Sequence, residues 1–276
     1  MSKHAEEVRE FYNQYGAREW DRLNSTIYMR INFLLHMDFM KEYLVPGAKV
    51  LDAGCGAGRY AVEFARMGCE VTLFDISDEQ LRIAKEKVDE ANLSSSLNAV
   101  IQGDIRDLSM FQDDTFDVVI CYGAPLSYII EGRELAVKEL ARVAKPSGMV
   151  ALSVNNKWGI LKMLLGNQYP DFFNNKEYWY IDQVIETGDL PRHEQVSHPA
   201  RHFFEAAELQ ALMSQAKLQD ITLAGSPLFS CGNSNQVNEM GKDEKAYETI
   251  LDIELRTYTN PTMVDNGEFL LAKARK

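Results

Sequence analysis

The feature that most constrains the fold is a regular alternation of short apolar runs and helical segments between residues 48 and 154. Short apolar runs are typical of buried strands, and helices between successive strands are typical of βαβ units in a parallel sheet. The alternation therefore predicts an α/β fold in which helices cover both faces of a mostly parallel sheet. We expect its strands at Lys49–Asp52, Glu70–Phe74, Ala99–Gln102, Phe116–Cys121 and Met149–Val154.

Apolar residues at helical spacing predict helices between and after these strands. Pro146 and Gly148 break helical geometry, so we expect a turn at residues 145–148. Beyond the fifth strand the regular pattern stops for about fifty residues and then resumes. The expected helices are Gly58–Met67, Ser77–Glu90, Glu131–Val143, Phe204–Ala216 and Glu244–Leu255, and the expected later strands are Asp220–Ala224 and Glu268–Ala272.

These patterns divide the chain into an N-terminal helical lid (residues 1–45) and a larger α/β domain (residues 46–276). The α/β domain carries an inserted cap at about residues 157–203, after the fifth strand, and a second insertion at about residues 226–266. The apolar stretch Ile27–Leu44 contains five ionisable or charged side chains, which is too many for a bilayer span. We interpret it as a buried helix of the lid.

The charge of the chain limits its partners. A formal net charge of −12 opposes binding to a nucleic-acid backbone, and the basic residues do not cluster in the sequence.

The first ten residues lack the apolar segment of a secretory signal, so we expect a cytoplasmic protein. Its four cysteines form no C-x-x-C pair, and we expect reduced, structural thiols. The oligomeric state is left open.

The segment VLDAGCGAGRY (residues 50–60) carries most of the functional information. A strand ends at Asp52 and is followed by Gly54, Gly56 and Gly58, which allow a ligand to approach the backbone closely. A carboxylate at this position would repel the phosphates of a dinucleotide, whereas S-adenosylmethionine (SAM) carries ammonium and sulfonium cations. The glycine spacing also departs from G-x-G-x-x-G. Both points favour SAM over NAD.

Two further acidic residues follow the next two strands. Asp75 comes 21 residues after Gly54, where a carboxylate can accept hydrogen bonds from both ribose hydroxyls. Asp104 and Ile105 follow the third strand, where they suit an adenine amino group and ring face. For Asp75 alone, capping of the following helix remains an alternative. Three acidic residues at three consecutive strand ends predict a site for an adenosine ligand.

The segments LDAGCGAGR, LFDIS, GDIRDL, FDVVICYG and VKELARVAKPSGMV resemble those of the class I SAM-dependent methyltransferases over roughly residues 45–155. The resemblance implies a Rossmann-like sheet of seven strands with the last strand antiparallel. It also implies SAM as cofactor and S-adenosylhomocysteine as product. The residues it places around the cofactor, beside Asp52 and Gly58, are Gly54, Cys55, Gly56, Asp75, Ile76, Asp104, Ile105, Tyr122 and Gly123.

Fewer residues are candidates for contact with the methyl acceptor than for contact with the cofactor. Tyr12, Tyr15 and Trp20 could cover the cofactor, although aromatic residues at helical spacing are more often core. Tyr15 and Tyr128 could contact the acceptor. Three histidines, His193, His198 and His202, lie within ten residues and could contact the acceptor or take its proton. No regular ligand set accompanies them, so we expect no metal. The aromatic tract Tyr169–Tyr180 is either an acceptor pocket or packing within the cap.

The sequence thus favours a SAM-dependent methyltransferase that acts on a small molecule, without nucleic acid or membrane as partner. Two alternatives stay open. A SAM- or nucleotide-binding regulatory protein could share the fold without catalysis, and an NAD-dependent oxidoreductase could share the glycine turn. The identity of the acceptor and the need for a general base are not determined by the sequence.

Overall fold

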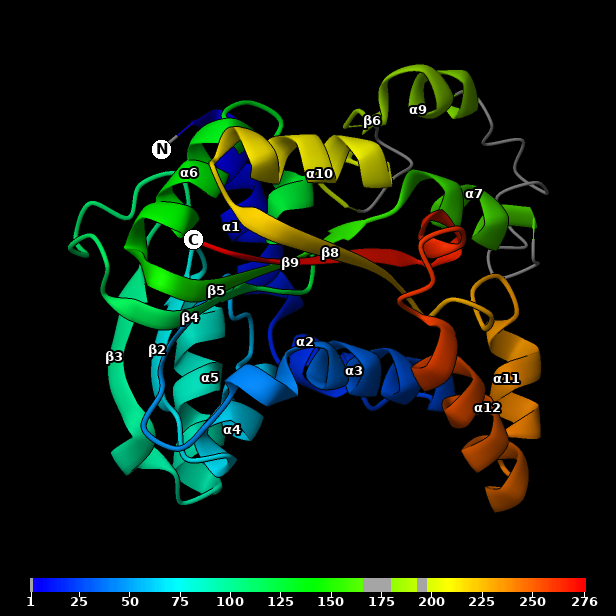
Figure 1. The fold of residues 1–276 in the computed structure, drawn as a ribbon, viewed down its shortest axis with the longest axis horizontal. Coiled ribbons are helices and arrows are strands. Elements are labelled where there is room, and N and C mark those ends of the chain that lie inside the picture. Colours follow the sequence, from blue (N-terminus) through cyan, green and yellow to red (C-terminus); the bar gives the residue numbers. More distant parts are fainter. Residues whose placement is uncertain (1, 166–179, 193–197) are drawn as a thin grey trace.

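The computed structural model describes residues 2–165, 180–192 and 198–276, and its centre is a seven-stranded sheet (Figure 1). The strand order is β3-β2-β1-β4-β5-β9-β8. The first five strands run parallel, and β9 pairs antiparallel with both β5 and β8. The expected Rossmann-like fold is confirmed. The strands are β1 (Lys49–Ala53), β2 (Glu70–Asp75), β3 (Leu97–Gln102), β4 (Phe116–Cys121), β5 (Ala144–Asn155), β8 (Gln219–Ser226) and β9 (Phe269–Arg275).

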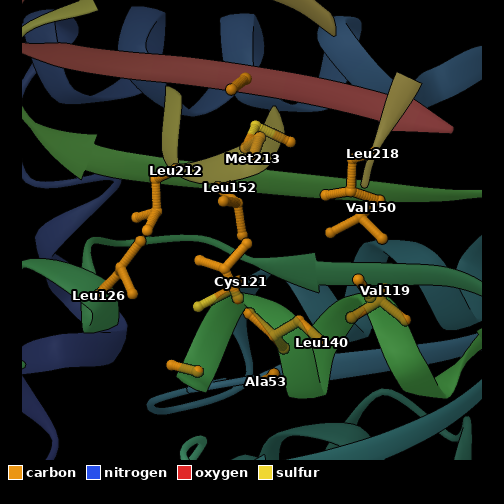
Figure 2. Close-up of a cluster of buried hydrophobic side chains, with 14 of the residues drawn as sticks. Ala53, Val119, Cys121, Leu126, Leu140, Val150, Leu152, Leu212, Met213 and Leu218 are labelled. Atoms are coloured by element: carbon orange, nitrogen blue, oxygen red, sulfur yellow. The ribbon is translucent and has the colours of Figure 1, made fainter. Parts of the chain in front are cut away.

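Helices cover both faces of the sheet. Successive residues of the central strands point to opposite faces, and those on each face are buried against helices. On one face, β4 and β5 present Val119, Cys121, Val150 and Leu152 to Leu140 of α6 (Arg133–Val143). α10 (Ala206–Gln215) adds Leu212 and Met213 to this cluster (Figure 2). Buried aliphatic side chains of this size each stabilise the fold by about 1.5–3 kcal/mol. The other face packs against α3 (Ile27–Met40), α4 (Arg59–Arg66) and α5 (Asp78–Glu90).

The N-terminal residues form α1 (Lys3–Tyr15), α2 (Arg18–Arg22) and α3, followed by a short 3-10 turn at Lys41–Tyr43. α1 begins at the capping hydroxyl of Ser2, which accepts from the Ala5 N–H. Its far end is tied to α5, where Asn13 bonds with Asp78 and Ser77. α3 does not belong to a lid, because Tyr28, Ile31 and Leu35 pack against β8, β9, α11 (Ser234–Met240) and α12 (Glu244–Thr257).

Two insertions leave the sheet near its ligand-binding edge. The described part of the first contains α7 (Lys157–Leu165), α9 (Ile181–Thr187) and the paired strands β6 (Asp189–Leu190) and β7 (Arg201–His202). The second contains α11 (Ser234–Met240), α12 (Glu244–Thr257) and a 3-10 turn at Val264–Asn266. Most of the aromatic tract Tyr169–Tyr180, including Tyr178 and Trp179, lies outside the described residues.

The turn expected at residues 145–148 lies within the bounds of β5. Ala144 pairs with Phe116 and Met149 pairs with Val118, so the four residues between them have no partner on β4. The register shifts between Phe116 and Val118, and Ser147 takes a positive φ of 63°. A local irregularity in the pairing of β5 with β4 thus accommodates Pro146. The four cysteines are buried and free, and no helix among the described residues is long and apolar enough to cross a membrane.

Candidate active site

A cavity of about 500 Å³ lies at the carboxyl ends of the first four parallel strands. Ligands of open α/β sheets bind at this edge, where the strand order reverses between β1 and β4. The loops after β1, β2, β3 and β4 form its floor, and α1 and α2 supply the opposite wall. Of the sequence-derived candidates, the cavity is lined by Gly54, Cys55, Gly56, Asp75, Ile76, Asp104, Ile105, Tyr122, Gly123 and Tyr128.

The glycine loop has two different roles. Gly54 has a φ of 79°, and a Cβ there would come within 2.3 Å of Pro125 Cγ, so only glycine fits beside the loop after β4. Gly56 has a φ of 50° and faces the cavity. Gly58 does not line the cavity. A Cβ on Gly58 would lie 2.8 Å from Ala84 Cβ, so this glycine lets α4 and α5 pack closely.

Asp75 combines the two roles that the sequence left open. Its two carboxylate oxygens accept from the backbone N–H groups of Gly56 and Ser77, each at 2.8 Å. The carboxylate therefore braces both the glycine loop and the start of α5, while it also lines the cavity. Burial raises the pKa of Asp75 to about 6, although the two N–H bonds work against the rise.

Asp52 lies beneath the loop rather than on the cavity wall. Its side chain is 1% exposed, and Oδ2 has no hydrogen-bond partner among the described residues. Burial, followed by the charge of Asp75, raises the pKa of Asp52 to about 8. The sequence expectation of a direct cofactor contact at Asp52 is thus not matched by its position, because the residue does not line the cavity.

Asp104 lines the cavity at the end of β3 and is held by Arg106. The guanidinium Nε donates to both carboxylate oxygens at 3.0 and 3.1 Å. Burial works to raise the pKa of Asp104, but the hydrogen bonds and charge of Arg106 outweigh it, so the pKa is lowered. Asp104 is therefore ionised at neutral pH, unlike the carboxyl group of Asp52.

An ion pair from α2 also lines the cavity, and its residues are not among the candidates expected from the sequence. Arg22 donates to Glu19 at 2.6 and 2.9 Å, and both residues line the cavity. Glu19 Cγ lies 3.4 Å from the position of a Cβ on Gly56, and Arg22 Nη2 lies 3.8 Å from that of Gly123. The pair thus places one negative and one positive charge directly above the two glycine turns. No local signal distinguishes it from an ordinary i,i+3 surface pair.

Comparisons with known proteins agree with this geometry. A family model described as a methyltransferase domain matches residues 50–148. The methyltransferase candidate YqeM of Bacillus subtilis is 30% identical over 51% of this chain and 55% of its own length, so the match spans about half of that relative. The ubiquinone biosynthesis O-methyltransferase of Xanthomonas oryzae is 27% identical over 67% of this chain and 69% of its own.

A solved SAM-dependent methyltransferase of Thermotoga maritima shares the fold at a TM-score of 0.53 and 17% identity, covering 98% of this chain and 99% of its own. Residues 50–148 thus match the methyltransferase domain family, and the chain shares the fold of a solved SAM-dependent methyltransferase. The cofactor of this family is SAM. In this chain the residues present fit it, since glycine turns and the acidic side chains of Asp75 and Asp104 meet in one cavity.

The methyltransferase places aromatic side chains along the cavity, though not all those expected. Tyr128 lines it, whereas Tyr15 does not and stacks on Phe11 at 5.8 Å between ring centroids. Tyr12, one turn earlier on α1, takes the place expected of Tyr15 and meets Tyr128 edge-on at 5.7 Å. The rotation of α1 about its axis determines which of the two tyrosines faces the cavity. The sequence alone does not determine that rotation.

The histidine candidates of the methyltransferase have separate environments. His202 is 3% exposed and lies between Asp189 at 2.6 Å and Glu208 at 2.9 Å, away from the cavity wall. This position corrects the expectation that His202 contacts an acceptor, because both ring nitrogens are already occupied. His198 contacts Phe11 of α1 at 5.0 Å, and burial lowers its pKa to about 4. His193 lies outside the described residues.

Among the described residues, no three metal-ligating side chains come together. A buried histidine that the sequence analysis did not single out, His36, lies 5.0 Å from Tyr122 and 5.7 Å from Phe269. Burial lowers its pKa to about 4, so it is neutral at physiological pH. Its polar neighbours on α3 and β8 are Asn32 and Ser226.

Proposed function

We propose that this protein transfers the methyl group of SAM to a hydroxyl group of a small aromatic molecule. The observation that carries the proposal is the cavity at the ends of β1–β4, in which the glycine loop, two acidic side chains and an aromatic wall meet. The match of residues 50–148 to a methyltransferase domain supports the transfer of a methyl group. The class of the methyl acceptor is what this proposal adds.

The residues that would hold the cofactor follow from their positions. Asp75 lies at the end of β2, where its carboxylate can accept from the ribose hydroxyls, and Asp104 with Ile105 would bracket the adenine at the end of β3. Glu19 and Arg22 present opposite charges above Gly56 and Gly123, which suits the ammonium and carboxylate groups of a methionine moiety.

The bound cofactor supplies an electrophilic methyl group on a sulfonium. The protein's part is to align an acceptor in line with it and to exclude water. Tyr12, Tyr60, Tyr122 and Tyr128 line the cavity, and aromatic faces attract a sulfonium cation while offering apolar surface to an aromatic acceptor. α1 covers these groups and restricts access from solvent.

Two points support a small hydroxyl-bearing acceptor. A net charge of −12 disfavours RNA or DNA, and the cavity volume suits a cofactor with a small molecule beside it. The relative from Xanthomonas oryzae is named as an O-methyltransferase of ubiquinone biosynthesis, which supports an oxygen acceptor by analogy.

Ligand binding and turnover test the proposal in two steps. S-adenosylhomocysteine should bind in calorimetry and raise the melting temperature, because it binds the folded state alone. NADH should do neither. A panel of small phenols, beginning with catechol, should then yield S-adenosylhomocysteine from SAM. Binding without turnover of any phenol would point to the regulatory alternative or another acceptor, and binding of NADH alone would overturn the assignment.

A further inference from the structure

A group of polar side chains lies around Glu268, at the start of β9, within reach of the charge of Arg22, which lines the cavity. Glu268 Oε2 accepts a hydrogen bond from the Tyr28 hydroxyl on α3 at 2.7 Å. Burial raises the pKa of Glu268, while Tyr28 and the charges of Arg22 and Arg201 lower it in part. Cys231 lies close enough for the charge of Glu268 to raise the thiol pKa. Groups from four separate segments therefore face this carboxyl group.

The group around Glu268 is connected to the cavity on two sides. Arg22 lines the cavity from α2, and Ala200, the neighbour of Arg201, lines it from the cap. Within the sheet, β5 lies between β4 and β9, so Glu268 is at the same edge as Tyr122. His36 joins the two, because its ring meets both Tyr122 and Phe269.

Three buried polar atoms at this edge have no hydrogen-bond partner among the described residues. They are the Tyr122 hydroxyl after β4, Asn155 Oδ1 at the end of β5 and Arg201 Nε in the cap. A buried polar atom without a partner costs about 1–3 kcal/mol. Three of them along one edge indicate that a polar ligand supplies their partners.

The backbone that carries Glu268 is held tightly. Its N–H donates to Pro227, and its carbonyl accepts from the Asn156 N–H at 3.0 Å. A Cβ on Gly267 would come within 2.5 Å of the Ser226 nitrogen, so the chain on each side is closely packed. A carboxylate on such a backbone is preorganised, which is what proton transfer requires.

We propose that the acceptor hydroxyl binds at this edge, between Tyr122 and Arg201, and that Glu268 is the catalytic base that removes its proton. This inference rests on the proposed methyl transfer. The acceptor O–H bond breaks, its proton passes to the Glu268 carboxylate, and the oxygen forms a bond to the methyl carbon as the carbon–sulfur bond breaks. The products are the methyl ether, neutral S-adenosylhomocysteine and the carboxylic acid of Glu268, which then loses its proton to solvent.

The contrasting interpretation is that Glu268 only neutralises Arg22 and Arg201. The two interpretations differ in what happens to a bound phenol. A base takes the proton of the phenol, whereas a neutralising carboxylate leaves the phenol protonated. An ionisable chromophore such as 4-nitrocatechol reports this difference directly, without any need for turnover.

The experiment compares the parent protein with Glu268→Gln and with Glu248→Gln, which makes the same change at an exposed position on α12. With S-adenosylhomocysteine present and at a pH below the pKa of free 4-nitrocatechol, the parent and Glu248→Gln should bind the yellow phenolate. Glu268→Gln should bind the colourless phenol. With catechol as acceptor, kcat of Glu268→Gln should fall about 10²–10⁴-fold, while affinity for S-adenosylhomocysteine changes less than about twofold.

Tyr28→Phe provides a second test, because loss of its hydrogen bond should raise the Glu268 pKa and move the acidic limb of the kcat profile to higher pH. The inference is overturned if 4-nitrocatechol does not bind, or if all variants bind it in the same ionisation state. In either case S-adenosylhomocysteine binding and methyl transfer to another acceptor would persist, so the proposed function would stand. Loss of S-adenosylhomocysteine binding by the parent protein would instead remove the proposed function itself.

Discussion

The cofactor side and the acceptor side of the cavity are built in different ways. On the cofactor side, the glycine loop, Asp75 and Asp104 follow three strands that are consecutive in the chain. On the acceptor side, the contact between Tyr28 and Glu268 joins residues 240 positions apart. The difference teaches that most of the proposed cofactor contacts come from loops close together in the chain, with Glu19 and Arg22 added by α2, whereas the proposed acceptor edge depends on contacts between distant segments.

The largest test of this contrast uses two glycines of the same loop. Gly58→Val should lower the free energy of unfolding by about 3–5 kcal/mol, because its side chain would overlap Ala84 at a φ that disfavours branched residues. Gly56→Ala meets only Glu19 Cγ at 3.4 Å and should mainly weaken cofactor binding. Urea unfolding and calorimetry with S-adenosylhomocysteine measure the two effects. If the two variants behaved alike, the division of roles within the loop would be wrong.

Asp75→Ala should weaken S-adenosylhomocysteine binding by about 1–3 kcal/mol, through loss of charge-assisted hydrogen bonds to the ribose. It should also lower stability, since two backbone N–H groups lose their acceptor. Asp89→Ala on the exposed face of α5 is the matched control and should leave affinity unchanged. An unchanged affinity in Asp75→Ala, together with lower stability, would show that Asp75 acts only as a brace.

On the acceptor side, His202→Gln should cost about 1–3 kcal/mol of stability and leave cofactor affinity unchanged. The ring spans Asp189 and Glu208, and Arg133 pairs with the same two carboxylates, so this contact fastens the cap to α6 and α10. Thermal unfolding and calorimetry check both parts. A loss of turnover with catechol at full stability would restore the catalytic interpretation of His202.

The last test concerns the pH dependence of stability. The pKa values of Asp52 and Asp75 are raised to about 8 and about 6, so the folded protein binds more protons than the unfolded chain above about pH 4. Stability without ligand should therefore fall as pH rises toward 8, by at most about 1.4 kcal/mol per pH unit for each group. Asp52→Asn should flatten this dependence between pH 6 and 8. A parallel pH profile for the variant would exclude Asp52 as its source.

The comparison also explains what the sequence could and could not predict. Helical and strand periodicity located all seven strands and the acidic residues after β2 and β3, because both signals lie within a few residues. The acceptor contact was expected at Tyr15 rather than Tyr12, because the side of α1 that faces the cavity depends on what the helix packs against. Glu19, Arg22 and Glu268 gave no signal, since their partners in space are set by tertiary packing rather than by spacing.

Gly58 and His202 show the opposite error. Each belongs to a pattern that suggests chemistry, a glycine-rich turn and a histidine cluster, and each contributes to packing in the structure. Motifs identify a segment without dividing it into ligand-binding and structural positions. That division required the orientation of side chains relative to the cavity.

The antiparallel strand β9 has a consequence for how the molecule assembles in time. β8 joins the sheet only through β9, and β9 pairs with β5 across more than a hundred intervening residues. The strands β1–β5 instead meet neighbours that are closer in sequence. Because distant pairing carries a larger loop-closure entropy, the β1–β5 unit should form first in refolding and the β8–β9 pair later. The edge that carries Glu268 would then be among the last parts of the molecule to take shape, after the glycine loop is already in place.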